Sequence, residues 1–146
     1  MDAMTSVPAS IPYVSATERG SWTLHGFGEL RLLRAALRLA VAGNPLSGPG
    51  SAAAGDLAEP IIVVANELAT NALRHGRAPT VVRLLTEPGR LILDVVDHRP
   101  EAFPRPDGDR PPGRGGLGLR LTARFAIDFG WYATGATKHV WAAFPS

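Results

Sequence analysis

The chain has 146 residues, of which 45% are hydrophobic and 19% charged, a composition typical of one globular domain rather than of a disordered chain. It contains no cysteine, which excludes disulfide bonds, thiolate metal sites and a cysteine nucleophile. The 15 basic and 13 acidic side chains nearly balance, and no apolar run reaches the roughly 18 residues of a membrane span. We therefore expect a cytoplasmic protein that binds neither nucleic acid nor membranes directly.

The N-terminal region divides into a lead-in and a first strand. Residues 1–20 are rich in Ser, Pro, Thr and Ala without periodicity, and they predict a flexible lead-in. The folded domain is then expected over residues 21–146. Residues 21–26, SWTLHG, alternate apolar and polar side chains and predict the first strand.

Residues 28–43 predict the first helix. Leucines recur at helical spacing, and Gly43 ends the pattern. A second stripe on the same helix consists of Arg31, Arg34 and Arg38. This stripe is either a solvated face or a docking surface for an acidic partner.

Residues 57–75 predict a second helix, and its end carries the stretch NELATNALRHG. Glu67, Asn71 and His75 recur every four residues there, so they share one stripe on the flank of the apolar face. A charge in that position is partly desolvated and needs a partner. Helix geometry alone does not decide between two interpretations of this stripe. Either Glu67 pairs with an arginine and Asn71 caps a loop, or the amide oxygen binds Mg²⁺ and the carboxylate acts as a base.

Residues 78–97 predict a β-hairpin around a Pro88-Gly89 turn, and its second strand ends at Asp97. That aspartate either only terminates the strand or accepts a hydrogen bond from an exocyclic amine such as that of adenine. Residues 98–114 contain five prolines and form a long connection of the kind that serves as a lid.

The last part of the chain predicts a glycine-led helix and two closing strands. Glycines in GRGGLGL, residues 113–119, let backbone N–H groups approach phosphate, although a flexible hinge is equally consistent. Strands are expected at 130–134 and 138–144. The order of elements predicts an α/β two-layer sandwich, with a mixed, largely antiparallel sheet and helices packed on one face.

Taken in this order, the motifs resemble a known family. A helix with E-x-x-x-N, a strand ending in Asp, a long loop and a glycine-led helix resemble the Bergerat-type ATP-binding domain of the histidine-kinase, gyrase and Hsp90 superfamily. The size and the endings are similar to its bacterial anti-sigma-factor serine kinase branch. NELATNALRHG is the most specific match, and DVVDHRP, GRGGLGLRL and KHVWAAF correspond to further motifs.

This resemblance implies roles for individual residues. Asn71 would bind Mg²⁺, Glu67 would be the catalytic base, and Asp97 would bind the adenine amine of ATP. His75 is equally consistent with packing at the helix C-terminus, and Lys138 either contacts the nucleotide or is solvated. The other implied nucleotide-binding residues are Arg74, His75, Gly115, Gly116, Leu117, Gly118, Leu119 and His139.

The implied function is that of an ATP- and Mg²⁺-dependent protein serine kinase. Such a kinase phosphorylates an anti-anti-sigma partner and sequesters a sigma factor, commonly as a homodimer. The alternative is a nucleotide-gated binding module of the same fold without kinase activity. Arg99, where the family often has glycine, and His139, where it often has threonine, favour the alternative, whereas Glu67 and Asn71 oppose it.

Overall fold

Five strands form one sheet in the computed structural model, which describes residues 16–43, 52–101 and 117–146. The sheet order is β1-β2-β3-β5-β4, and all four pairings are antiparallel. The strands are β1 (Thr17–Leu24), β2 (Thr80–Glu87), β3 (Arg90–Asp97), β4 (Asp128–Ala133) and β5 (Lys138–Pro145). The predicted sheet is therefore confirmed, although the described strands contain no parallel pair.

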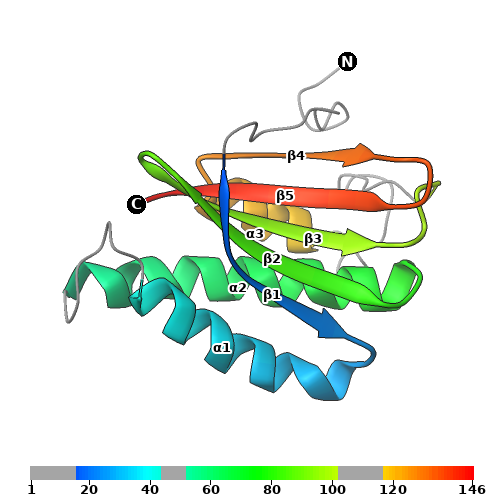
Figure 1. Cartoon of the computed structure of the whole chain (residues 1–146), viewed down its shortest axis with the longest axis horizontal. Helices are drawn as coiled ribbons and strands as arrows, with labels where there is room; N and C mark the ends of the chain where they lie inside the picture. Colours follow the sequence, from blue (N-terminus) through cyan, green and yellow to red (C-terminus); the bar gives the residue numbers. More distant parts are fainter. Residues whose placement is uncertain (1–15, 44–51, 102–116) are drawn as a thin grey trace.

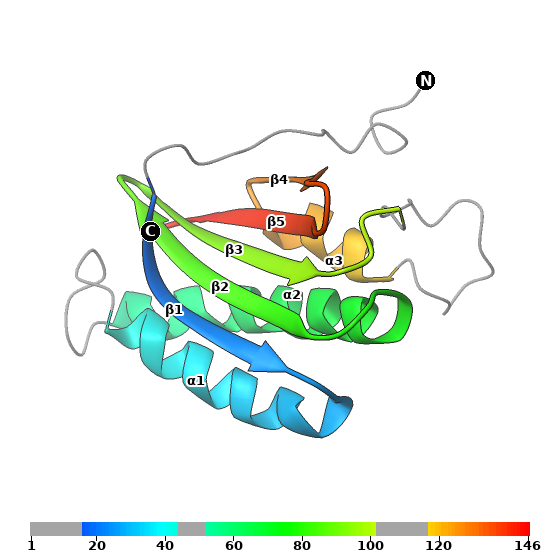
Figure 2. The same ribbon diagram turned by 45° about the vertical axis from the view of Figure 1, so that its right-hand side comes forward.

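In the described part of the chain, three α-helices cover one face of this sheet (Figures 1 and 2). They are α1 (Leu30–Ala42), preceded by the 3-10 turn η1 (Phe27–Glu29), α2 (Ala52–His75) and α3 (Leu117–Phe125). The long helix α2 packs against α1, α3 and the central strands. The two-layer α/β sandwich is confirmed. Among the described residues, no helix is both long and apolar enough to cross a membrane.

The main hydrophobic core lies between the helices and the sheet, because side chains alternate between the two faces of a strand. Val95 on β3 and Phe144 on β5 belong to this core, and so do Leu37 on α1 and Ile61 on α2. A smaller cluster occupies the opposite face of the sheet and consists of Leu85, Ile92, Trp141 and Ala143. Apolar side chains on both faces of β3 and β5 bury these central strands.

The starts of two elements differ from the prediction by four or more residues. β1 begins at Thr17, so the last residues of the expected lead-in pair with β2. α2 begins at Ala52 rather than near residue 57, because an alanine run has high helix propensity. The predicted hairpin turn is confirmed, with Gly89 at a φ of 81°, a conformation that glycine adopts readily. Most of the predicted lid, residues 102–114, lies outside the described residues.

Candidate functional site

The candidate site lies where the C-terminus of α2 meets the end of β3. Asp97, the last residue of β3, is 1% exposed. Gly76 directly follows α2 and lies against this carboxylate. A Cβ atom at Gly76 would be 2.6 Å from Oδ2 of Asp97 and 2.6 Å from the carbonyl oxygen of Ala72. Only glycine therefore allows the helix to end this close to the aspartate.

Both carboxylate oxygens of Asp97 have protein partners. Oδ2 lies 3.1 Å from Nζ of Lys138, which is the first residue of β5 and lies opposite Asp97 in the strand register. Oδ1 accepts a hydrogen bond of 2.8 Å from the backbone N–H of Arg99. The lysine is 6% exposed, so this is a buried ion pair. These contacts hold the carboxylate in one orientation at the end of the sheet.

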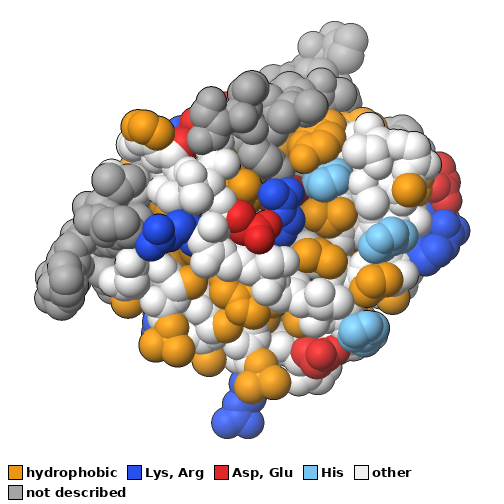
Figure 3. All heavy atoms as spheres, viewed as in Figure 1, with side chains coloured by type: hydrophobic (Ala, Val, Ile, Leu, Met, Phe, Trp, Pro, Cys, Tyr) orange, Lys and Arg blue, Asp and Glu red, His pale blue; other side chains and the backbone are white. Residues whose placement is uncertain are grey.

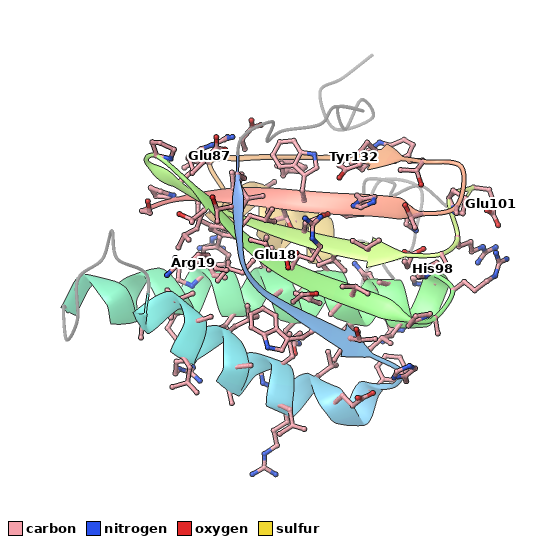
Figure 4. All side chains as sticks on the ribbon, viewed as in Figure 1. Glu18, Arg19, Glu87, His98, Glu101 and Tyr132 are labelled. Carbon is pink, nitrogen blue, oxygen red and sulfur yellow. The ribbon has the colours of Figure 1, made fainter. Side chains whose placement is uncertain are left out.

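The side chain of Arg99, which replaces the glycine common in the family, lies against the end of α2. Its Nη1 donates a hydrogen bond of 2.8 Å to the carbonyl oxygen of His75, and its Nε lies 3.9 Å from Glu101. A cation is favourable there because the last carbonyls of a helix lack helical partners. Figure 4 labels His98 and Glu101 at this end of β3. The guanidinium thus caps the C-terminal end of the helix.

The stripe on α2 contains two polar side chains that the described residues leave unpartnered. Glu67 and Asn71 are half-buried and make no hydrogen bond or ion pair with the described part of the chain. The arginine contact falls instead on Asn66, whose Oδ1 accepts a hydrogen bond of 2.8 Å from Nη1 of Arg34. Within the described part of the chain, Glu67 therefore lacks the arginine partner that the structural interpretation of the stripe expects.

This donor set fits a magnesium ion bound together with a nucleotide. Mg²⁺ prefers hard oxygen ligands and usually takes few from the protein, with phosphates and water completing its shell. The amide oxygen of Asn71 is such a ligand, and the carboxylate of Glu67 lies one helical turn before it. Arg74 is exposed and His75 half-buried in the following turn. Their expected contacts to a nucleotide remain predictions.

His139 does not lie with this group, which corrects the prediction that it contacts the nucleotide. Its Nδ1 lies 3.1 Å from Oδ2 of Asp94, and its Nε2 lies 3.0 Å from Oγ1 of Thr137. The ring stacks on Tyr132 with centroids 4.3 Å apart. Neighbouring residues of a strand face opposite sides, so Lys138 faces the helices and His139 faces away from them.

His139 belongs instead to a polar network on the face of the sheet that is opposite the helices. Asp94 is fully buried there and also accepts a hydrogen bond of 2.8 Å from Nη1 of Arg83. Arg83 in turn pairs with Glu18 at 2.9 Å. Figure 3 shows acidic and basic side chains adjoining one another in the middle of this face, and Figure 4 labels Glu18 there. The network joins β1, β2, β3 and β5, which indicates a structural role.

The predicted phosphate-binding segment is described only in part. Gly115 and Gly116 lie outside the described residues. Leu117, Gly118 and Leu119 form the first turn of α3, which packs against α2. The N–H groups of a first helical turn lack helical partners, as phosphate binding requires. Their contact with phosphate stays a prediction.

Sequence reasoning missed two residues of the site, Thr80 and Gly76, and left Lys138 undecided. Thr80 opens β2 and is fully buried on the helix-facing side. Alternate residues of a strand share a face. In the sequence TVVRLL, the apolar Val82 and Leu84 could therefore have placed Thr80 on the core face with them. Gly76 carries no such signal, because its importance comes from a residue 21 positions later in the chain.

A family comparison agrees with this geometry. The model of the histidine kinase-like ATPase domain family matches residues 29–144. The chain therefore belongs to this family, and the match includes Glu67, Asn71 and Asp97. No curated protein matches the chain. Family membership supports an ATP-binding regulatory module.

Proposed function

We propose that this protein is a cytoplasmic, ATP- and Mg²⁺-dependent protein serine kinase of the anti-sigma-factor type. One observation carries the proposal. Glu67 and Asn71 lie one turn apart on α2, half-buried and without partners among the described residues, on the helix that ends against Asp97. A carboxylate and an amide left unpaired beside a core are costly unless a ligand engages them.

The chemistry assigned to these residues is phosphoryl transfer. Asn71 would hold Mg²⁺, which would neutralise phosphate charge, and Asp97 would accept a hydrogen bond from the adenine amine. The seryl oxygen of a partner attacks the γ-phosphorus, the bond to the β-phosphate oxygen breaks, and ADP leaves. Glu67 orients the seryl hydroxyl and takes its proton. Catalysis then rests on positioning and charge neutralisation more than on covalent chemistry by the protein.

The proposed partners are a sigma factor and an anti-anti-sigma protein, with a homodimer as the working state. The arginine stripe on α1 is a poor docking surface, because Arg34 bonds Asn66 and Arg38 lies 2.8 Å from Glu59 on α2. The exposed side of α1 offers apolar area instead. Leu32 and Leu39 are 71% and 76% exposed and lie two turns apart on one stripe. This stripe supports a protein partner for α1.

A nucleotide-gated binding module without kinase activity is the second candidate. The observations that favour it are Arg99, where the family often has glycine, and His139, where it often has threonine. In that case nucleotide binding would change the protein's partner affinity, and no phosphate would be transferred.

The test is phosphate transfer from labelled ATP to proteins that co-purify with the chain. We expect wild type to label a serine of one partner and Glu67→Gln to lose at least about a hundredfold in rate while still binding ATP. The matched control is Glu59→Gln on the same helix, because Glu59 only forms an exposed ion pair. Wild type that binds ATP and its partner but transfers nothing would reject the kinase in favour of the binding module.

A further inference from the structure

Three polar side chains form a row across the helix-facing side of the sheet: Thr80 on β2, Asp97 on β3 and Lys138 on β5. Asp97 and Lys138 are register partners, and the register that pairs Val81 with Val96 places Thr80 beside Asp97. The exposed fractions are 0% for Thr80, 1% for Asp97 and 6% for Lys138. The row lies at the end of the sheet where Gly76 brings α2 against the aspartate.

The hydroxyl of Thr80 is an unsatisfied group in this row. Its Oγ1 is buried and has no hydrogen-bond partner among the described residues. Buried hydroxyls are nearly always hydrogen-bonded, because an unpaired one loses its water without compensation. Valine would fill the same volume without that cost. A threonine here is therefore explained best by a partner outside the described residues, such as a bound ligand.

Beside Thr80, the ion pair of Asp97 and Lys138 presents a hydrogen-bond acceptor next to a donor. Oδ2 of Asp97 accepts, and Nζ of Lys138, 3.1 Å away, donates. The Watson–Crick edge of adenine has the complementary order, with an exocyclic amine that donates beside a ring nitrogen, N1, that accepts. The amine has a second N–H, which needs a second acceptor.

We propose that Thr80 and Lys138 join Asp97 in recognising the base of ATP, so that three groups read the adenine edge. The amine donates to Asp97 and to the hydroxyl of Thr80, and N1 accepts from the ammonium group of Lys138. Burial strengthens each of these bonds, because little water competes for them. Guanine and hypoxanthine carry an oxygen at the position of the amine, and this oxygen would be repelled by the carboxylate of Asp97. The inference rests on ATP binding and deepens the proposed function by naming what selects the nucleotide.

A ligand comparison on unmodified protein tests the role of Lys138. Isothermal titration would compare ATP with 1-deaza-ATP, which keeps the amine and lacks the N1 acceptor. We expect 1-deaza-ATP to bind wild type about tenfold more weakly, the effect of one hydrogen bond to a charged donor. In Lys138→Met the two nucleotides should bind equally. Equal binding of both to wild type would overturn the role of Lys138, whether or not the variant folds.

Thr80→Val tests the hydroxyl. We expect about a fivefold loss of ATP affinity, while the Tm without nucleotide stays the same or rises because an unsatisfied buried hydroxyl is gone. Thr86→Val is the matched control, since Thr86 lies on the same strand and face at the other end. Unchanged ATP affinity in a folded Thr80→Val protein would overturn the role of Thr80. Binding is measured apart from phosphate transfer, so loss of the kinase hypothesis alone leaves this inference intact.

Discussion

Lys138 and Asp97 join the first residue of β5 to the last residue of β3, with Nζ 3.1 Å from Oδ2 and both side chains nearly excluded from solvent. Removing either partner leaves the other charge buried without its counterion. A buried charge in that state costs several kcal/mol, whereas removing both partners can cost much less. This contact therefore matters for stability, apart from its proposed role in nucleotide recognition.

Asp97→Asn and Lys138→Met should each lower the free energy of unfolding by about 3 kcal/mol, and the double variant by clearly less than the sum. Urea denaturation of the two single variants and the double variant measures the coupling. Glu59→Gln is the control, because its ion pair with Arg38 is more than half exposed and should contribute about 0.5 kcal/mol or less. Additive effects of Asp97→Asn and Lys138→Met would show that the two charges do not interact.

Gly76→Ala should destabilise the protein by about 1 to 3 kcal/mol, because the new Cβ would overlap the carboxylate of Asp97 and a backbone carbonyl. We also expect weaker ATP binding, since relief of the overlap moves Asp97 or the end of α2. Thermal unfolding and ATP titration measure the two effects. Gly135→Ala is the matched control, with no atom within 4 Å of its added Cβ. An alanine at residue 76 that is tolerated as well as one at residue 135 would contradict the close approach.

Asn71→Ala should remove the dependence of ATP binding on Mg²⁺, because the proposed metal ligand is lost. The matched control is Asn66→Ala on the same helix. Asn66 bonds Arg34, so that variant should lose about 1 kcal/mol of stability and keep its Mg²⁺ dependence. ATP titrations with and without Mg²⁺ compare the two variants. Equal Mg²⁺ dependence in wild type and Asn71→Ala would reject Asn71 as the ligand.

The fold was predictable because its signals are local. Leu30, Leu33, Leu37 and Val41 lie at helical spacing, and all four are buried in α1. The hairpin turn follows from the Pro88-Gly89 pair alone. α2 and its polar stripe were also predicted, although the helix extends back through an alanine run to Ala52, before its predicted start at residue 57.

The sequence does not predict which side chains of β5 face the helices, and the position of Lys138 in the site depends on this. Val140, Ala142 and Phe144 are apolar on one face, and Trp141 and Ala143 are apolar on the other. A strand that is apolar on both faces has no alternation to decide which neighbour at its start faces the helices. The choice between a lysine and a histidine therefore needed the cross-strand partners. The contact between Arg34 and Asn66 was not predictable either, because it joins two helices across 32 positions of the chain.

His139→Ala should leave ATP affinity within about twofold of wild type, because the imidazole lies on the opposite face of the sheet from Asp97. Its stability should fall by about 1 to 2 kcal/mol, through loss of the contact with Asp94 and the stacking on Tyr132. ATP titration and urea denaturation separate the two effects. A tenfold loss of affinity at unchanged stability would return His139 to the nucleotide site.

The exposed stripe of α1 gives the prediction for partner binding. Leu32→Asp with Leu39→Asp should change the free energy of unfolding by no more than about 1 kcal/mol, because both side chains already lie in solvent. Binding to the partner should fall at least about a hundredfold, since truncating apolar anchors of an interface has effects of this size. Pull-down of a co-purifying partner, followed by titration, measures the loss. The control is Arg31→Ala, which changes an exposed residue beside the stripe and keeps both leucines. If the double aspartate variant binds the partner as wild type does, the docking surface lies elsewhere than on α1.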